Sequence, residues 1–444
     1  MIPERAEIKY PAAPIAAAFP ERLAVAARLR GLEPCPPERS RVLELGCGAG
    51  GNLLPLAASW PGASCVGLDI DATAIDEASQ LSRELELGNA QFHAHDLRDA
   101  RSLLAGQRFD YVVAHGVYSW VSEAARSALL ELCGAVLAEH GVVYLSYGSY
   151  PGFHVQQVLR DMLRFHVSAP AGSLLAVQQA RELIAALLAQ PLPGLASPEL
   201  LRRELVALAD ASDVRLTYDD LAETQGFWLE DVVARAARHG LAFVGDASAA
   251  AYADLLGVRR FNRTLLCRTE RRPSAQEAAR LLGLQVACPP FAPLPPVSAA
   301  AWQLPGDGGA VVSVRDARLR AALARVRQAW PQTLAVEALG SDPGLLGALL
   351  ELSEAGVVRL ALGKPACVSG VSERPAASPY ARACARLGRP IASQYHEQVP
   401  LPPRHRELLQ LLDGQRDQAA LSALFGEPLA QMLQDLEHNA LLIA

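Results

Sequence analysis

Residues 42–50 read Val-Leu-Glu-Leu-Gly-Cys-Gly-Ala-Gly, a short apolar strand that runs into glycines at positions 46, 48 and 50. Because glycine has no Cβ and tolerates positive φ, such a loop brings bare backbone close to a ligand. The helix expected from Gly51 would turn its N-terminal N–H groups toward the same place. An acid, Glu44, precedes the first glycine by two residues. The stretch therefore predicts a ligand-binding turn between a strand and a helix.

Two further strand-like segments end in acids. The segment 65–69 ends in Asp69, which follows Gly50 by 19 residues, and a carboxylate at about this spacing meets a ribose in a βαβ unit. The segment 90–97 carries Asp96 near its end. Each acid alone is equally well explained as the N-cap of a helix. Three acids at matching positions of three strands instead indicate one shared binding site at the carboxyl ends of these strands.

This series resembles the first motifs of class I S-adenosylmethionine (SAM) methyltransferases. In that family the glycine loop holds the methionine part of SAM, and an acid at the position of Asp96 accepts a hydrogen bond from the adenine amino group. The resemblance implies SAM as the cofactor, S-adenosylhomocysteine (SAH) as the product, and no metal. The residues that it assigns to the cofactor are Tyr10, Glu44, Gly46, Cys47, Gly48, Gly50, Asn52, Asp69, Ile70, Asp96, Leu97 and His115.

Length and composition limit the possible classes of protein. A chain of 444 residues exceeds one ordinary core, so two to four domains are expected. A net charge of −6 argues against extensive binding to nucleic acid. The eight cysteines include no C-x-x-C pair, so neither disulfides nor a structural zinc site is expected. With no signal-type run and no uncharged stretch of ~18 residues, we expect a cytoplasmic protein without membrane insertion.

Strands and helices alternate from Arg41 onward, which predicts an α/β fold with a parallel sheet covered on both faces. The resemblance makes this a Rossmann-like, seven-stranded class I methyltransferase sheet. Strands are expected at 41–45, 64–68, 90–94, 109–114, 142–147, 241–244 and 260–267, and helices at 51–59, 72–86, 122–139 and 229–240.

The predicted organisation has seven parts. They are an N-terminal cap (1–40), a SAM-binding core (41–152), a helical insertion (153–214), the completion of the core (215–272), a proline-rich linker (273–297) and two winged-helix-like α+β domains (298–370 and 371–444). The insertion is expected as a lid over the carboxyl edge of the sheet and is a candidate homodimer surface. Neither winged-helix-like copy has a basic recognition face, so packing or protein docking is favoured over DNA binding.

The methyl acceptor should lie where loops follow strands four and five. Methyl transfer from a sulfonium depends mainly on proximity and orientation, so the side chains that shape the acceptor pocket are the informative ones. Five of them are predicted near one mouth: Tyr118, Trp120, Tyr147, Tyr150 and His154. An aromatic cleft suits an amine or ammonium group through cation–π contact. The competing interpretation is that about half of these rings pack the insertion against the sheet.

A narrower resemblance covers nearly the whole chain. The motifs Val-Leu-Glu-Leu-Gly-Cys-Gly (42–48), His-Gly-Val-Tyr-Ser-Trp-Val (115–121) and Tyr-Pro-Gly-Phe-His (150–154) are similar to bacterial methyltransferases with a "methyltransferase regulatory domain". That family includes the rickettsial outer-membrane-protein lysine methyltransferases. The resemblance implies N-methylation of lysine on a protein substrate. The alternatives are a small-molecule or peptide N- or O-methyltransferase, and a non-catalytic SAM-binding regulator.

Overall fold

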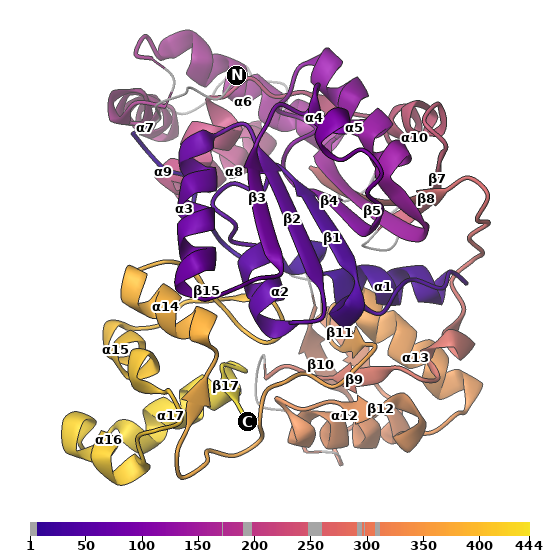
Figure 1. Cartoon of the computed structure of the whole chain (residues 1–444), viewed down its shortest axis with the longest axis vertical. Coiled ribbons are helices and arrows are strands. Elements are labelled where there is room, and N and C mark those ends of the chain that lie inside the picture. The colour runs from indigo at the N-terminus through magenta and orange to yellow at the C-terminus, as the bar shows by residue number, and fades with distance from the viewer. Residues whose placement is uncertain are drawn as a thin grey trace.

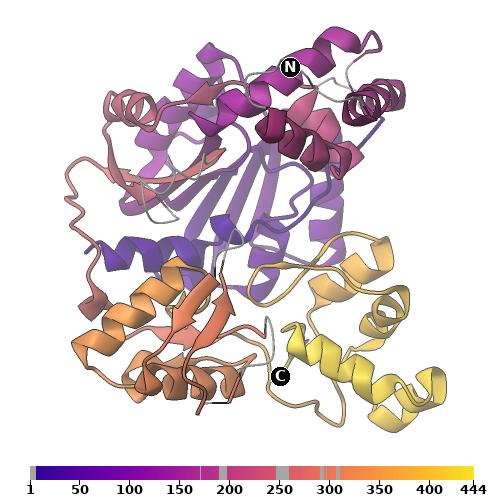
Figure 2. The same cartoon turned by 180° about the vertical axis from the view of Figure 1, so that it is seen from behind.

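The computed structural model describes residues 7–170, 172–189, 198–246, 260–290, 295–296, 298–306 and 311–444. A twisted sheet occupies the middle of the molecule, with a helical layer at one end and two further units at the other (Figure 1). The view from behind shows the same three levels (Figure 2). Parts of the predicted cap (1–6), insertion (190–197) and linker (291–294) lie outside the described residues.

The central sheet has the strand order β3-β2-β1-β4-β5-β8-β7. Strands β1 to β5 run parallel, while β8 lies antiparallel between β5 and β7. A two-residue strand, β6, adds to β5, so the sheet has eight strands where seven were expected. The bounds are β1 Arg41–Leu45, β2 Ser64–Asp69, β3 Ala90–Ala94, β4 Phe109–Ala114, β5 Leu137–Ser149, β6 Gly226–Phe227, β7 Leu241–Asp246 and β8 Phe261–Arg268. The predicted α/β, Rossmann-like fold is confirmed.

The connecting helices cover both faces of the sheet. They are α1 Pro20–Leu29, α2 Leu53–Ser59, α3 Ala72–Glu84, α4 Ala100–Leu103, α5 Glu123–Val136 and α10 Leu229–Ala237. The predicted helix at 122–139 and the predicted strand at 142–147 need correction. α5 ends at Val136, and β5 begins at the next residue, Leu137. Leu137 is fully buried and pairs with Phe109 of β4, so sheet pairing overrides the helical propensity of this segment.

The helical insertion packs around its own apolar core. It comprises α6 Gly152–His166, α7 Leu174–Ala189, α8 Pro198–Ala209, α9 Asp213–Arg215 and a π-helical turn, Leu216–Asp220. The buried guanidinium of Arg160 on α6 pairs with the buried carboxylate of Asp220 at 3.2 Å. Since an unpaired buried charge is costly, this pair fixes the turn to α6. The insertion therefore extends to residue 220, beyond the predicted end at 214.

The first C-terminal unit corrects the linker prediction. Residues 285–287 form β9, the middle strand of the sheet β12-β9-β13, because Val286 and Ala287 are buried in this unit rather than solvent-exposed. Its core is closed by Trp302 and by Val25 and Leu29 of α1. The elements are β9 Gln285–Ala287, β10 Trp302–Pro305, β11 Val311–Val314, α12 Ala317–Ala329, β12 Leu334–Ala335, α13 Pro343–Glu354 and β13 Arg359–Ala361.

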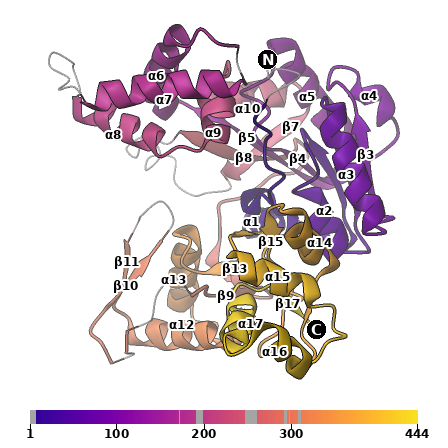
Figure 3. The same ribbon diagram turned by 90° about the vertical axis from the view of Figure 1, so that its left-hand side faces the viewer.

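The second C-terminal unit packs directly on the sheet domain. Its apolar core extends to Leu54 of α2 and Leu81 of α3, and α14 contacts α2 (Figure 3). The elements are β14 Ala376–Ala377, α14 Pro379–Leu387, β15 Ile391–Ala392, β16 Gln398–Val399, α15 Pro403–Leu411, α16 Gln418–Phe425, α17 Leu429–His438 and β17 Leu442–Ile443. This unit is therefore attached to the same helices that follow the glycine-rich loop.

Candidate cofactor and acceptor site

The conformation of the glycine-rich loop is fixed by hydrogen bonds of its own backbone. The N–H groups of Gly46 and Cys47 donate to the Leu68 carbonyl at 2.7 and 3.0 Å, which ties the loop to the end of β2. Gly48 has φ +50°, and a Cβ added there would meet no atom within 4 Å. A side chain at Gly48 would therefore fill free space in front of the loop. We call this space, in which a ligand could contact the bare backbone, the cradle.

Glu44 lies at the base of this cradle with half of its carboxylate unused. Its Oε1 accepts a hydrogen bond from Asn52 Nδ2 at 3.1 Å. Its Oε2 is buried and has no hydrogen-bond partner among the described residues. Burial raises the pKa of the Glu44 carboxyl to about 8, despite the opposing bond from Asn52. Without a ligand this carboxyl is therefore mainly protonated at neutral pH, with its proton on Oε2. A cationic group bound beside Oε2 would supply the missing countercharge and favour the carboxylate, and the amino group of SAM fits this need.

Asp69 connects the loop to the next helix. Its Oδ2 accepts from the Gly48 N–H at 2.7 Å and its Oδ1 from the Asp71 N–H at 3.0 Å. The carboxylate therefore faces the glycine loop from the end of β2, and its predicted contact with a ribose stays a prediction. The next residue, Ile70, is 74% exposed, which is an unfavourable position for an aliphatic side chain unless a ligand covers it.

Asp96 lies after β3 at the same edge. Arg98 binds its carboxylate through Nη2 at 2.5 Å and through the backbone N–H at 2.8 Å. These bonds hold the pKa of Asp96 below its usual range. Leu97 beside it is half-buried against the main core. The predicted adenine acid is thus already paired, and Arg98 is a neighbour that the sequence pattern did not reveal.

The loop after β4 and the N-terminal segment also lie at the carboxyl edge of the sheet. His115 Nδ1 lies 3.0 Å from the Tyr144 hydroxyl, and burial lowers the pKa of His115 to about 4, so its ring is neutral. The Ile15 N–H donates to Asn52 Oδ1 at 3.1 Å, which places the N-terminal segment across the start of α2. Tyr10 on this segment is 64% exposed. Asn52 itself is buried and bonded within the protein, so it supports Glu44 rather than facing the ligand space.

The five predicted acceptor residues occupy three places. Tyr118 and Tyr147 are fully buried in the core, and the Tyr147 hydroxyl bonds to Thr264 at 2.9 Å. Tyr150 stacks on His154 at 3.8 Å. Trp120 lies apart from both pairs and donates through Nε1 to the Tyr218 carbonyl at 2.7 Å. The prediction of one mouth is corrected, since β5 turns the Tyr147 side chain into the core.

The structure arranges the remaining predicted rings in two groups and adds three aromatic residues that were not predicted, Tyr218, Phe261 and Trp228. In the first, the Tyr10 ring meets the Tyr218 ring edge-on at 5.3 Å, and Trp120 stacks parallel to Phe261 at 6.1 Å. In the second, Trp228 joins the Tyr150–His154 stack at 5.5 Å from Tyr150 and is 42% exposed. No local signal could have identified Tyr218, because it lies on the π-helical turn of the insertion.

Asp219 adds a charge to the first group. It follows Tyr218 on the π-helical turn and interacts electrostatically with Tyr10. Burial, and secondarily the neighbouring Asp220, raises the pKa of Asp219 to about 6. At neutral pH Asp219 is therefore mainly a carboxylate near the exposed ring of Tyr10, with Arg160 and Arg215 also acting on it. Ring faces and a carboxylate are groups that attract an ammonium group.

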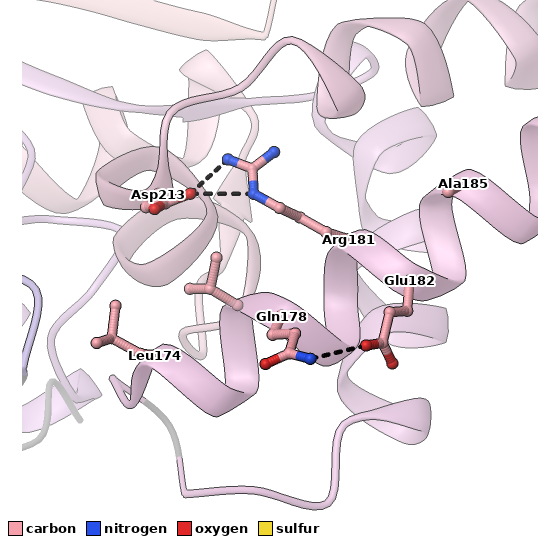
Figure 4. Close-up of a pocket in the computed structure, with 7 residues that line it drawn as sticks. Leu174, Gln178, Arg181, Glu182, Ala185 and Asp213 are labelled. Carbon is pink, nitrogen blue, oxygen red and sulfur yellow. Dashed lines mark hydrogen bonds and ion pairs between the residues drawn. The ribbon is translucent and has the colours of Figure 1, made fainter.

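A groove of about 390 Å³ lies elsewhere, on the outer side of the insertion (Figure 4). Arg181 of α7 crosses it to pair with Asp213 at 3.0 Å, and Gln178 bonds to Glu182 at 2.9 Å. None of the predicted site residues lines this groove. Among the described residues, no three His, Cys, Asp or Glu side chains form a group that would hold a metal. No helix in that part of the chain is long and apolar enough to cross a membrane.

A sheet in this order, with a glycine-rich loop after β1 and acids after β2 and β3, defines the class I SAM-dependent methyltransferases. Comparison with protein families agrees. Residues 42–141 match the family described as "Methyltransferase domain". Residues 373–441 match the "PKMT, C-terminal winged helix domain". The chain therefore carries one segment that matches a methyltransferase domain and another that matches a winged helix of the PKMT type.

Individual relatives extend these matches. An uncharacterized protein of Rickettsia prowazekii (strain Madrid E) is 31% identical over 60% of this chain and 52% of its own length. A second protein of that strain is 33% identical over 36% of this chain and 63% of its own length. The chain thus spans between half and two thirds of the length of these curated relatives. The structure of PKMT2 from Rickettsia typhi has the same fold, with a TM-score of 0.85 and 21% identity over 98% of this chain and 100% of that chain. PKMT2 has also been solved in complex with AdoHcy.

Proposed function

We propose that this chain transfers the methyl group of SAM to the side-chain amine of lysine residues in a protein substrate. The observation that carries the proposal is the first aromatic group, in which Tyr10, Trp120 and Tyr218 lie together with the carboxylate of Asp219. We call these four residues the acceptor wall. A wall with π faces and one negative charge selects a cationic acceptor, such as lysine, over an anionic or neutral one.

The cofactor part of the proposal rests on the residues at the glycine loop. Glu44 Oε2 offers a buried acceptor to the amino group of SAM, and Asp69 faces the ribose position from the end of β2. Ile70 would lose its exposed surface under the adenine ring. When bound, SAM supplies a methyl group on a positively charged sulfur.

The acceptor wall would bind and orient the lysine, which must lose its proton before it attacks the methyl group. A free lysine has a pKa of about 10.4, so only about one side chain in a thousand is nucleophilic at pH 7. The Asp219 carboxylate and the ring faces would hold the ammonium on entry, and they oppose loss of its proton. Burial in the site and the positive sulfur of bound SAM act the other way and would lower the pKa of the lysine, so that the proton leaves to water. His115 is a poor proton carrier here, because its pKa of about 4 keeps it neutral.

Family similarity supports the choice of a protein acceptor. The winged helix at 373–441 is named for PKMT proteins, and the Rickettsia typhi PKMT2 structure has the same fold over nearly the whole chain. The predicted homodimer stays a prediction. Val158, Met162 and Phe165 are exposed along one face of α6, which is a surface that a second copy would cover.

The proposal is tested by incubating the protein with SAM labelled on its methyl group and a lysate of the host, followed by mass spectrometry. We expect label on lysine side chains, with a rate that rises between about pH 7 and pH 9 as the amine loses its proton. Label on small molecules, carboxylates or nucleobases would contradict the lysine assignment. Tight binding of SAH without any transfer would instead indicate a regulator.

A further inference from the structure

We infer that the C-terminal winged helix is a positioning part of the cofactor site, acting through His396, Asn52 and Glu44. His396 lies on the β15–β16 hairpin, within the segment that matches the winged-helix family. Its Nε2 lies 2.5 Å from Asn52 Oδ1, and Asn52 Nδ2 lies 3.1 Å from Glu44 Oε1. Two hydrogen bonds thus connect the winged helix to the acid at the base of the cradle. The inference rests on the proposed cofactor site.

The direction of both hydrogen bonds is fixed by a backbone group. The Ile15 N–H can only donate, and it donates to the same Asn52 oxygen at 3.1 Å. That oxygen must therefore be the carbonyl Oδ1, so His396 Nε2 must carry a hydrogen and donate. The Asn52 NH₂ group is then turned toward Glu44. This arrangement uses Oε1 of Glu44 and leaves Oε2 free for a ligand.

His396 is held firmly in this position. Its ring stacks on Phe19 with centroids 4.9 Å apart and planes within 3°, and its side chain is buried. Its backbone has φ +58°, a conformation that residues other than glycine seldom adopt and that persists where surrounding contacts impose it. Burial lowers the pKa of His396 to about 3, so the ring is neutral and donates one hydrogen bond.

A second contact from the same unit reaches the loop itself. Arg389, which follows α14, donates through Nη2 to the carbonyl of Ala49 at 3.1 Å. Ala49 lies between Gly48 and Gly50. The winged helix therefore contacts both the glycine loop and the residue that orients Glu44. A displacement of this unit would disturb two supports of the cofactor cradle at once.

Calorimetric binding of SAH to the full-length chain tests the inference. His396→Phe keeps the stack on Phe19 and removes the donor, so we expect SAH to bind about five- to tenfold more weakly, the effect of one buried hydrogen bond. The KM for SAM should rise by a similar factor while kcat changes by less than about twofold. His396→Gln retains an N–H donor and should restore SAH affinity to within about twofold.

The matched control is Arg386→Gln. Arg386 also connects the winged helix to the sheet domain, through an ion pair with Glu84 of α3 at 3.1 Å, but it does not contact the glycine loop. SAH affinity should be unchanged in this variant. Unchanged affinity in a folded His396→Phe protein, or equal losses in His396→Phe and Arg386→Gln, would overturn the inference.

Asn52→Ala provides a second route if His396→Phe does not fold. It breaks the connection beside Glu44, so SAH affinity should fall, and adding His396→Phe should cause no further loss. Full affinity in Asn52→Ala, or an additive loss in the double variant, would contradict the inference. A wild-type chain that binds SAH but methylates no protein lysine would refute the proposed function and leave this inference standing.

Discussion

The cofactor cradle is formed by the glycine loop (46–50) with Glu44 and Asp69. It differs from the acceptor wall in how far apart along the sequence its residues lie. The cradle is built from β1, β2 and the loop that follows β1, and its hydrogen bonds join Gly46 to Leu68 and Gly48 to Asp69. The acceptor wall joins Tyr10, Trp120 and Tyr218, which come from the N-terminal segment, the loop after β4 and the insertion. The glycine loop is thus shaped by local backbone hydrogen bonds and only braced from the winged helix, whereas the wall exists only where three distant segments pack. We expect substitutions in the two regions to separate cofactor binding from acceptor turnover.

The largest effect is expected at Asp69. Asp69→Ala removes the acceptor of the Gly48 and Asp71 N–H groups as well as the proposed partner of the ribose. Because hydrogen bonds to a charged group are worth about 1.5–3 kcal/mol, SAH affinity should fall by up to about a hundredfold. Calorimetry measures this loss.

Asp110→Ala is the control for this measurement. Asp110 is also a sheet aspartate, but it pairs with Arg41 at the opposite end of β1. SAH affinity should stay within about twofold of the wild type in this variant, because Asp110 lies at the end of the sheet away from the glycine loop. Equal losses in the two variants would mean that Asp69 acts on stability alone.

A smaller effect is expected at the acceptor wall. Trp120→Phe removes the Nε1–H bond to the Tyr218 carbonyl, so kcat/KM for the protein acceptor should fall about tenfold, while SAH affinity stays within about twofold. Trp228→Phe, in the second aromatic group, serves as the control and should retain activity. If Trp228→Phe loses turnover and Trp120→Phe does not, the acceptor binds at the second group.

A further effect concerns the stability of the cofactor-free protein and its dependence on pH, not binding or turnover. The pKa of Glu44 is raised to about 8 in the folded, cofactor-free protein, above its value of about 4.5 when unfolded. The folded state therefore binds more protons between these values, and its free energy of unfolding should fall as pH rises from 5 to 8. The slope from this group is at most about 1.4 kcal/mol per pH unit. Glu44→Gln should flatten the decline in denaturant titrations, and an unchanged slope would contradict the raised pKa.

The sequence predicted the cradle far better than the wall. Glycine spacing and acids at strand ends are local features, and Gly48, Asp69 and Asp96 lie at the edge where they were placed. The side chains of Tyr118 and Tyr147 were misplaced because a motif does not show which face of the chain turns inward. β9 was hidden in a proline-rich segment, since a three-residue strand has no measurable periodicity. Tyr218 and His396 reach the site only through tertiary packing, and no spacing rule connects them to it.

A crystal structure of the chain with bound SAH tests the central proposal most directly. We expect SAH to occupy the space in front of Gly48, with Glu44 Oε2 bonded to its amino group and Ile70 covered. Its sulfur should lie nearer to Trp120 than to Trp228. SAH bound away from the glycine loop would contradict the cofactor site, and a sulfur facing Trp228 would contradict the acceptor wall.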